Sequence, residues 1–276
     1  MDRTYLSAPA VVTASRAFVC VRIATYEDEA EAAFTESIFR GRGGLENSVF
    51  TLLAPDGETL LTRSGRSPRM VFGGATAEDK LEAMVAEMDG VSQRYAEEAR
   101  ALAALPTAMD LRRGLNVAAC DLQPIAVLAV ADAEDRARAE ERLAQLAWSD
   151  EFIGECQYVV VADAAELAAL EGVPEGLVKE GELAEGGGVL VVQPGAFGLT
   201  GKVLAHAAAD DPKAVRAALA AGLEACEATA VDSREHVRSG RRTGKIWETV
   251  LDKEDGRPRR RGTERAPSEP GSDAGG

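Results

Sequence analysis

The chain has 276 residues, of which 46% are hydrophobic and 28% charged, and its formal net charge is −15. This is the composition of a soluble globular protein with one large domain or two of ordinary size, which needs neither disulfides nor a metal to hold a core. The charge argues against nucleic acid and anionic membranes as partners, because both attract surfaces rich in Lys and Arg. No apolar run is long enough to cross a membrane, and no signal-peptide pattern is visible.

The first part of the chain predicts helices and short strands. Pro9 suits a first helical turn, and residues 8–17 continue as a helix. Residues 18–24 are apolar and partly β-branched, which predicts a strand. A helix over 28–39 follows, with acidic side chains crowded into its first turn, where the helix dipole favours them.

A hairpin and a long helix complete this part. Residues 48–54 and 59–63 predict two strands, joined by a Pro-Asp-Gly turn in which Pro fixes φ and Gly accepts positive φ. Residues 76–104 predict a long helix, because apolar residues recur on one face. The order of elements is α-β-α-β-β-α.

The second half repeats this order and adds a first strand. The continuous apolar run 124–131 predicts a strand that is covered on both faces. The elements that follow are a helix over 132–148, a strand over 157–162, a helix over 163–171, strands over 189–192 and 201–208, and a helix over 211–228. The order is β-α-β-α-β-β-α.

These patterns divide the chain into five parts. Residues 1–105 and 124–230 are two α/β units, and residues 106–123, which begin with a helix-stopping proline, are predicted to link them. Residues 231–251 are predicted to be a last strand or docking segment that covers apolar surface. Residues 252–276 have no apolar residue larger than Ala or Pro, so they are predicted to be a disordered tail.

The cysteines carry no metal or redox pattern. Cys20, Cys120, Cys156 and Cys226 lie far apart, without the paired spacing of zinc ligands. Each lies in or beside a predicted helix or strand, so all four are interpreted as structural or incidental thiols outside disulfides. Such thiols suit a reducing compartment and favour a cytoplasmic location. We therefore assign no catalytic, cofactor-binding or metal-binding residue from the sequence.

One charged segment stands out. Residues Arg63–Arg69, with the sequence Arg-Ser-Gly-Arg-Ser-Pro-Arg, form a basic segment in an acidic chain. This segment can bind an anion or an acidic part of a partner, and the alternative is a solvated loop. The glycine-rich stretches 41–44 and 186–188 lack the spacing of a phosphate-binding loop, so both are interpreted as ordinary loops.

The order β-α-β-α-β-β-α is that of the thioredoxin fold, and parts of the chain resemble that family. Residues 18–29 resemble the second strand of a thioredoxin-like domain and its acidic exit loop, and residues 48–58 resemble the following hairpin with its Pro-Asp-Gly turn. Residues 1–11 resemble the segment that follows the active-site CxxC of thiol reductases. The resemblance implies two tandem thioredoxin-like units, each with three α/β/α layers, of which the first lacks its opening strand.

The redox features of that family are missing from this sequence. No CxxC precedes the first unit, and Asp132-Ala133-Glu134-Asp135 stands where a redox pair would open the first helix of the second. The cis-proline that faces the active-site cysteines in the family is absent near Asn47-Ser48 and near Gly187-Gly188. Dithiol exchange needs a thiolate stabilised at a helix N-terminus, so neither unit is predicted to be redox-active.

Two explanations of the missing start remain open. The chain is either a truncated product, with a Cys- or selenocysteine-containing motif upstream of Met1, or a degenerate domain that has lost its first strand. Without that strand, the sheet of the first unit has an exposed edge, and exposed edges recruit other strands. We therefore expect a homo-oligomer that forms through this edge.

Three functions follow from these observations. The first is thiol–disulfide redox handling by a thioredoxin-family protein that is inactive or incomplete as given, with a redox client as its partner. The second is a non-catalytic scaffold that binds a protein partner. The third is an anion or metal carrier that uses Cys20, Cys156 and the Arg63–Arg69 segment.

Overall fold

The computed structural model describes residues 5–39, 46, 48–96, 104–227, 232–245 and 247–251. It divides into two compact units, which are described separately. The N-terminal unit consists of the described residues of Met1–Val12, Cys20–Glu87 and Thr249–Gly276. The sheet unit consists of the described residues of Thr13–Val19 and Met88–Glu248.

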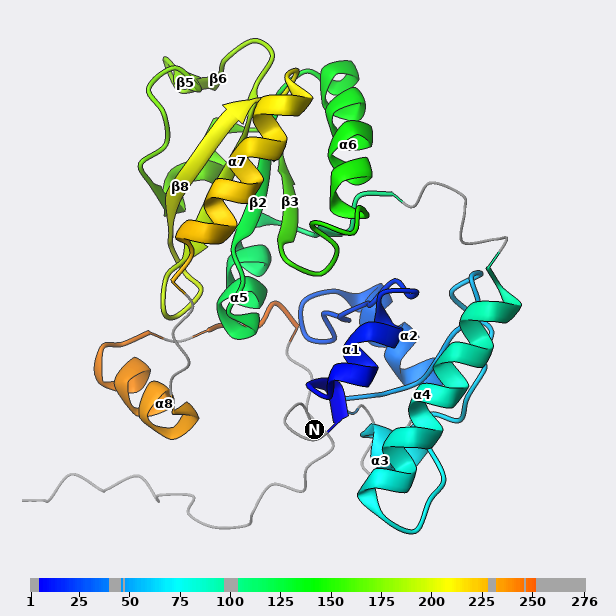
Figure 1. Ribbon diagram of the computed structural model, residues 1–276. Helices are drawn as coiled ribbons and strands as arrows, with labels where there is room; N and C mark the ends of the chain where they lie inside the picture. The colour runs from blue at the N-terminus through cyan, green and yellow to red at the C-terminus, as the bar shows by residue number, and fades with distance from the viewer. Residues whose placement is uncertain are drawn as a thin grey trace, which may run out of the picture. The chain divides into compact units, whose positions relative to one another are not determined.

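A mixed six-stranded sheet forms the centre of the sheet unit (Figure 1). Its strands are β1 Thr107–Ala108, β2 Ile125–Ala129, β3 Gln157–Val161, β4 Leu170–Glu171, β7 Gly188–Pro194 and β8 Gly201–Ala208. They lie in the order β1-β3-β2-β7-β8-β4. The pairs β1–β3, β2–β3 and β4–β8 are parallel, whereas β2–β7 and β7–β8 are antiparallel. Two short strands, β5 Val178–Lys179 and β6 Glu182–Leu183, form a separate antiparallel pair.

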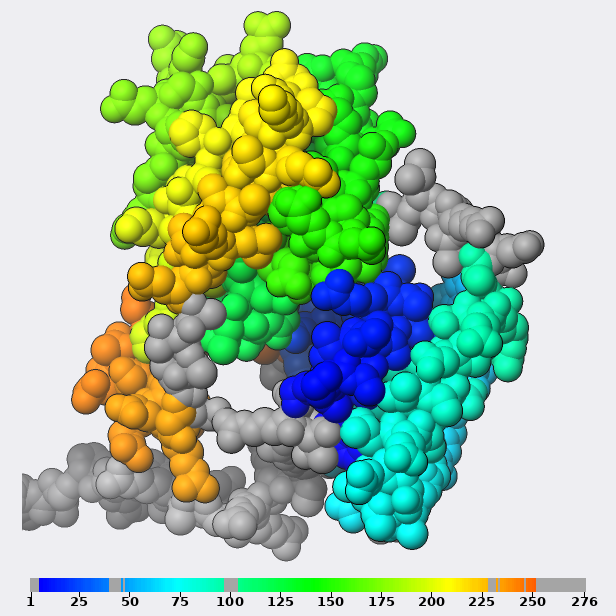
Figure 2. Space-filling model, in the orientation of Figure 1, coloured from blue at the N-terminus to red at the C-terminus, as the bar shows by residue number. Residues whose placement is uncertain are grey.

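Helices cover both faces of this sheet. Helix α5, Leu111–Asp121, packs on one face, and α6, Ala133–Ala147, packs with α7, Pro212–Ala225, on the other. Strand β2 is buried along its whole length because its side chains alternate between the two cores. Ala126 and Leu128 belong to the core under α6 and α7, while Ile125, Val127 and Ala129 belong to the core under α5. Figure 2 shows α7, in yellow, covering part of this unit's surface.

The elements predicted for residues 124–228 are found where the sequence places them. The strand over 124–131 is β2, the helix over 132–148 is α6, and the hairpin of 189–192 and 201–208 is β7 and β8. The helix predicted over 163–171 is a single short 3₁₀ helix, η3 Ala164–Ala169, followed by β4. A mixed α/β architecture is therefore confirmed for this part of the chain.

Residues 106–123 differ from the linker that the sequence predicts. They contain the edge strand β1 and helix α5, which begins after Asp110, whose carboxylate accepts a hydrogen bond from the Arg113 N–H at 2.7 Å. Leu111, Leu115 and Ala118 recur at helical spacing and are buried against the sheet. The prediction failed because Pro106 ends one element without excluding a helix that begins five residues later, at Leu111.

Four helices are described in the first part of the chain. They are α1 Pro9–Ser15, α2 Glu29–Ile38, α3 Pro68–Val71 and α4 Ala77–Arg94. Helix α2 begins after Asp28, whose carboxylate accepts from the Glu31 N–H at 2.9 Å, as the acidic start of the predicted helix indicates. Helix α4 occupies most of the predicted helix 76–104, of which residues 97–103 lie outside the described residues.

The strands predicted in residues 1–105 do not form regular β-structure. Residues 19–24 belong to no strand, and Val19 and Val21 are 58% and 70% exposed. The hairpin of 48–63 is reduced to two isolated antiparallel bridges, Phe50 with Gly65 and Leu53 with Leu60. An extended segment becomes a strand only where a neighbouring strand pairs with its backbone, and no described strand pairs with residues 19–24. The α/β/α layers expected for residues 1–105 are thus not found among their described residues.

The segment 231–251 differs from the predicted last strand. It contains helix α8, Ser233–Arg242, and its described remainder forms no strand. The His236 ring stacks on Phe197, with ring centroids 4.6 Å apart, and the Arg112 guanidinium lies 3.6 Å from the ring centroid of Trp247. Ring stacking and cation–π contacts therefore hold this segment, in place of the apolar cover that was expected. The predicted tail, 252–276, lies outside the described residues.

Candidate binding site

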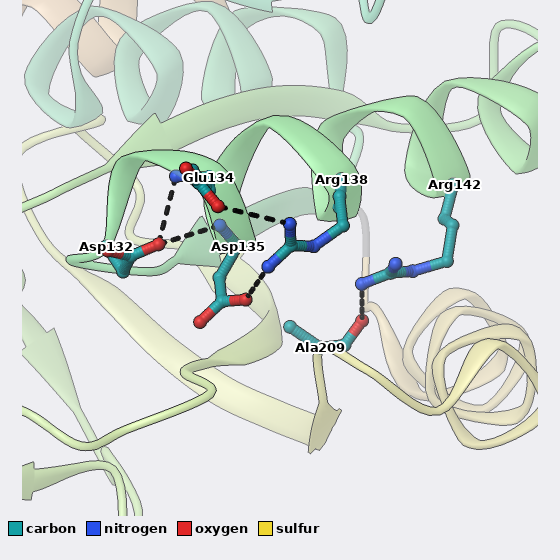
Figure 3. Close-up of polar contacts among 6 residues, drawn as sticks. All are labelled: Asp132, Glu134, Asp135, Arg138, Arg142 and Ala209. Atoms are coloured by element: carbon teal, nitrogen blue, oxygen red, sulfur yellow. Dashed lines mark hydrogen bonds and ion pairs between the residues drawn. The ribbon is translucent and has the colours of Figure 1, made fainter.

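The first turn of α6 begins at an acidic cap. Asp132 is the N-cap residue, and its Oδ1 accepts hydrogen bonds from the backbone N–H groups of Glu134 and Asp135, each at 2.9 Å (Figure 3). The hydrogen bond from the Asp135 N–H is the main cause of the lowered pKa of Asp132, which keeps this carboxylate ionised. A carboxylate is stable here because the free amides and the helix dipole favour negative charge.

Arginines on α6 occupy the next positions at this end of the sheet. Arg136 donates to the carbonyl oxygens of Val130 and Ala131, at 3.1 and 2.8 Å, which follow β2 directly. Arg138 lies between two carboxylates, 2.5 Å from Asp135 and 3.6 Å from Glu134 (Figure 3). Its charge is therefore satisfied within its own helix, at an exposed position where such pairs contribute little stability.

Arg142 joins α6 to the loop between β8 and α7. Its Nη2 donates to the Ala209 carbonyl oxygen at 3.2 Å (Figure 3). Its Nε is buried and has no hydrogen-bond partner among the described residues. The hydrogen bond to Ala209 therefore holds the loop between β8 and α7 beside the third turn of α6.

The loop before β7 closes against the end of β2. Gly187 has φ +61°, and a Cβ atom added to it would lie 2.2 Å from the Ala129 carbonyl oxygen and 2.6 Å from Val130 Cγ2. Only a residue without a side chain fits so close a backbone approach at positive φ. In the resemblance to thioredoxin-like domains, the start of α6 corresponds to the redox pair, and the residue before β7 corresponds to the cis-proline. These two positions lie at the same end of the sheet.

These elements border a cavity of about 380 Å³ that is open to solvent. It is lined by Asp135, Ala139 and Arg142 of α6, Glu185 and Gly186 of the loop before β7, and Ala209 and Asp210 of the loop before α7. Among the described residues, Glu185 and Asp210 take part in no ion pair, whereas Asp135 is paired with Arg138. Two carboxylates and the Arg142 guanidinium thus line the cavity outside any ion pair between described residues, which leaves a net negative charge.

The cysteines lie away from this cavity. Cys156 immediately precedes β3, Cys226 is the C-cap residue of α7, Cys120 lies near the end of α5, and Cys20 lies in the irregular stretch before α2. Burial raises the pKa of Cys156 to about 12 and also raises the pKa of Cys226, and desolvation by its neighbours raises that of Cys20. No described cysteine lies at a helix N-terminus, where a thiolate would be stabilised.

Ionisation of Cys156 gives the protein a measurable pH dependence. Its thiol ionises near pH 9 in the unfolded chain but only near pH 12 in the folded one, so the native state holds a proton that the unfolded state loses. Stability from this group is complete below pH 9 and falls above it, by up to about 1.4 kcal/mol per pH unit. We expect urea denaturation at pH 9 and 11 to show a steeper loss for the wild type than for Cys156→Ala. Equal losses would contradict burial of this thiol.

The Arg63–Arg69 segment is not part of the cavity beside α6. Arg63 Nε donates to the Val71 carbonyl oxygen at 3.0 Å, and Arg66 forms an ion pair with Glu46 at 3.1 Å. Arg69 lines a different cavity, in the N-terminal unit. The glycines of 186–188 lie at the candidate site, whereas those of 41–44 fall outside the described residues.

Sequence reasoning missed the residues that line the cavity, apart from Asp135 and Gly186. Arg142, Glu185 and Asp210 lie far apart in the chain and share no motif. Within the described ranges, no three His, Cys, Asp or Glu residues are placed to hold a metal ion. No helix in the described part of the chain is long and apolar enough to cross a membrane.

Comparison with known proteins assigns the chain to no family. No protein-family model, no curated protein and no solved structure is significantly similar to it.

Proposed function

We propose that the sheet unit is a thioredoxin-like domain that binds a protein partner without exchanging disulfides. When the two-residue strands β4, β5 and β6 are set aside, the elements from β2 onward follow the order β2-α6-β3-η3-β7-β8-α7. This order supports the proposal, because it is the β-α-β-α-β-β-α order of the family that the sequence resembles. A parallel β2–β3 pair precedes an antiparallel β7–β8 pair on one continuous sheet, with helices on both faces.

The observation that carries the non-catalytic assignment is the cap of α6. The carboxylate of Asp132 takes up the Glu134 and Asp135 amides that would otherwise stabilise a thiolate. The thiols whose pKa is shifted, Cys20, Cys156 and Cys226, are all shifted upward, which lowers the fraction of reactive thiolate. Binding is the function that this end of the sheet supports best.

The charged residues that line the cavity beside α6 indicate which chemical group of a partner binds there. Its two carboxylates outside ion pairs, Glu185 and Asp210, outnumber the one such cation, Arg142, which donates to the Ala209 carbonyl, and so favour a cationic group. A volume of about 380 Å³ accommodates one long side chain of a partner. We therefore propose that a Lys or Arg side chain in a protein segment binds here.

Binding can be tested with labelled peptides. A fluorescein-labelled decapeptide with three lysines is titrated with the full chain at low ionic strength, and its affinity is read from fluorescence anisotropy. Glu185→Gln combined with Asp210→Asn is expected to weaken binding about fivefold, because each partly exposed ion pair contributes about 0.2–1 kcal/mol. The charge-matched control is Glu141→Gln with Glu224→Gln, two exposed carboxylates outside the cavity.

Two outcomes would contradict the binding proposal. One is equal binding of a peptide in which glutamates replace the lysines. The other is an equal loss of affinity in the control variant, which would show that only the net charge of the protein matters.

The absence of dithiol exchange has a separate test. In an insulin-reduction assay with dithiothreitol, the full chain is expected to give no rate above that of dithiothreitol alone, because the pKa values of Cys20, Cys156 and Cys226 are raised. A rate that disappears in Cys20→Ser would overturn the non-catalytic assignment and favour redox handling.

A further inference from the structure

A second cavity, of about 580 Å³, lies within the N-terminal unit. It is lined by Tyr5, Ser67, Arg69, Lys80 and the loop Gly74–Ala77 that leads into α4. No Asp or Glu is among its lining residues, although the chain as a whole carries a net charge of −15. The local sign of charge is therefore positive, opposite to that of the cavity beside α6.

The polar side chains around this cavity have donors that no described residue uses. Arg69 makes no side-chain hydrogen bond or ion pair with a described residue, and Ser67 caps α3 without a side-chain hydrogen bond. Lys80 Nζ donates once, to the Arg69 carbonyl oxygen at 3.1 Å, which leaves two of its three N–H groups. These side-chain N–H and O–H groups lie around one cavity, so they are available to a ligand from solution that offers hydrogen-bond acceptors.

The buried hydroxyl of Tyr5 is a second, independent indication that a ligand binds in this cavity. Its side chain is only 5% exposed, and its buried hydroxyl has no hydrogen-bond partner among the described residues. Leaving a buried hydroxyl unsatisfied costs about 1–3 kcal/mol, so such groups are rare unless a ligand or water completes them. Tyr5 is also one of the residues that line the cavity, so a donor without a protein partner belongs to a residue of its wall.

The start of α4 lies at the same cavity and is capped by a carboxylate. Asp79 Oδ2 accepts from the Ala75 and Thr76 N–H groups, at 3.0 and 2.9 Å, and hydrogen bonds from the Thr76 and Ala75 N–H groups and the Thr76 hydroxyl lower the pKa of its carboxyl. This carboxylate offsets the positive end of the helix dipole. The positive charge at the cavity is therefore supplied by Arg69 and Lys80.

We propose that this cavity binds the phosphate group of a small phosphorylated molecule. Donors from three segments, Tyr5 near the N-terminus, Ser67 and Arg69 at α3, and Lys80 on α4, suit a tetrahedral group with several acceptor oxygens. A planar carboxylate offers fewer acceptors to donors so distributed. The volume matches a small organic ligand. Of the three arginines in the Arg63–Arg69 segment, Arg69 is the one that lines this site.

Phosphate binding is measured on the full chain by ³¹P NMR and calorimetry, with inorganic phosphate and glycerol phosphate as probes. Arg69→Gln and Lys80→Gln are each expected to weaken binding of both probes fivefold or more. Tyr5→Phe is expected to weaken binding at least twofold while leaving the melting temperature unchanged or higher, because it removes an unsatisfied buried hydroxyl.

The matched control is Arg94→Gln, which removes an exposed arginine at the other end of the same helix. It should change affinity by less than twofold. The proposal is overturned if neither probe binds saturably, if Arg94→Gln weakens binding as much as Arg69→Gln, or if acetate binds as tightly as phosphate. Tyr5, Arg69 and Lys80 belong to the N-terminal unit, so the outcome of their substitution is separate from that of the peptide titration at the sheet unit.

Discussion

Leu115→Ala is expected to lower the free energy of unfolding by about 3–5 kcal/mol. Leu115 is fully buried in the core that α5 shares with the sheet, where a Cβ placed on Gly201 would come within 2.9 Å of its Cδ2 atom. Removing its side chain leaves a cavity between the helix and two strands that are held by ladder hydrogen bonds, so the site cannot collapse. Urea denaturation followed by circular dichroism measures the loss.

The control for this change is Leu122→Ala, the residue that ends the same helix. Leu122 is 40% exposed, so its truncation is expected to cost about 0.5 kcal/mol or less. The comparison decides whether residues 106–123 are a core element or a linker. Equal, small losses at both positions would mean that α5 does not pack on the sheet.

Gly187→Ala is expected to destabilise the protein by about 3–5 kcal/mol. About 1–2 kcal/mol comes from placing a side chain at φ +61°. The remainder comes from the new Cβ, 2.2 Å from the Ala129 carbonyl oxygen, because this backbone atom ends a buried strand and cannot move away. The loop before β7 must shift, and the cavity beside α6 changes with it.

Gly186→Ala is the control for this change. Gly186 also has positive φ, at +77°, but a Cβ atom there meets nothing within 4 Å. Its substitution should therefore cost only the conformational term, about 1–2 kcal/mol. Thermal unfolding of the two variants side by side separates close approach from backbone conformation. A cost for Gly187→Ala no greater than for Gly186→Ala would show that the loop does not lie against β2.

The sequence identified the end of the sheet that carries the candidate site, but not the site's contents. Asp132 follows a buried apolar strand and precedes a helical pattern, so its position as a cap is a local property. Arg142, Glu185 and Asp210 come from three segments separated by more than twenty residues. Their proximity depends on the pairing of β2 with β7 and on the packing of α6 beside α7, which no local pattern encodes.

Between residues 124 and 228, the amino-acid pattern alone determined the type and order of β2, α6, β3, β7, β8 and α7, because each has a strong period or clear end signals. Tertiary structure decided the rest. Residues 19–24 are mostly apolar, yet they form no strand, because a strand exists only with a partner. Conversely, α5 has three buried residues on one face and gains its stability from the sheet beneath it.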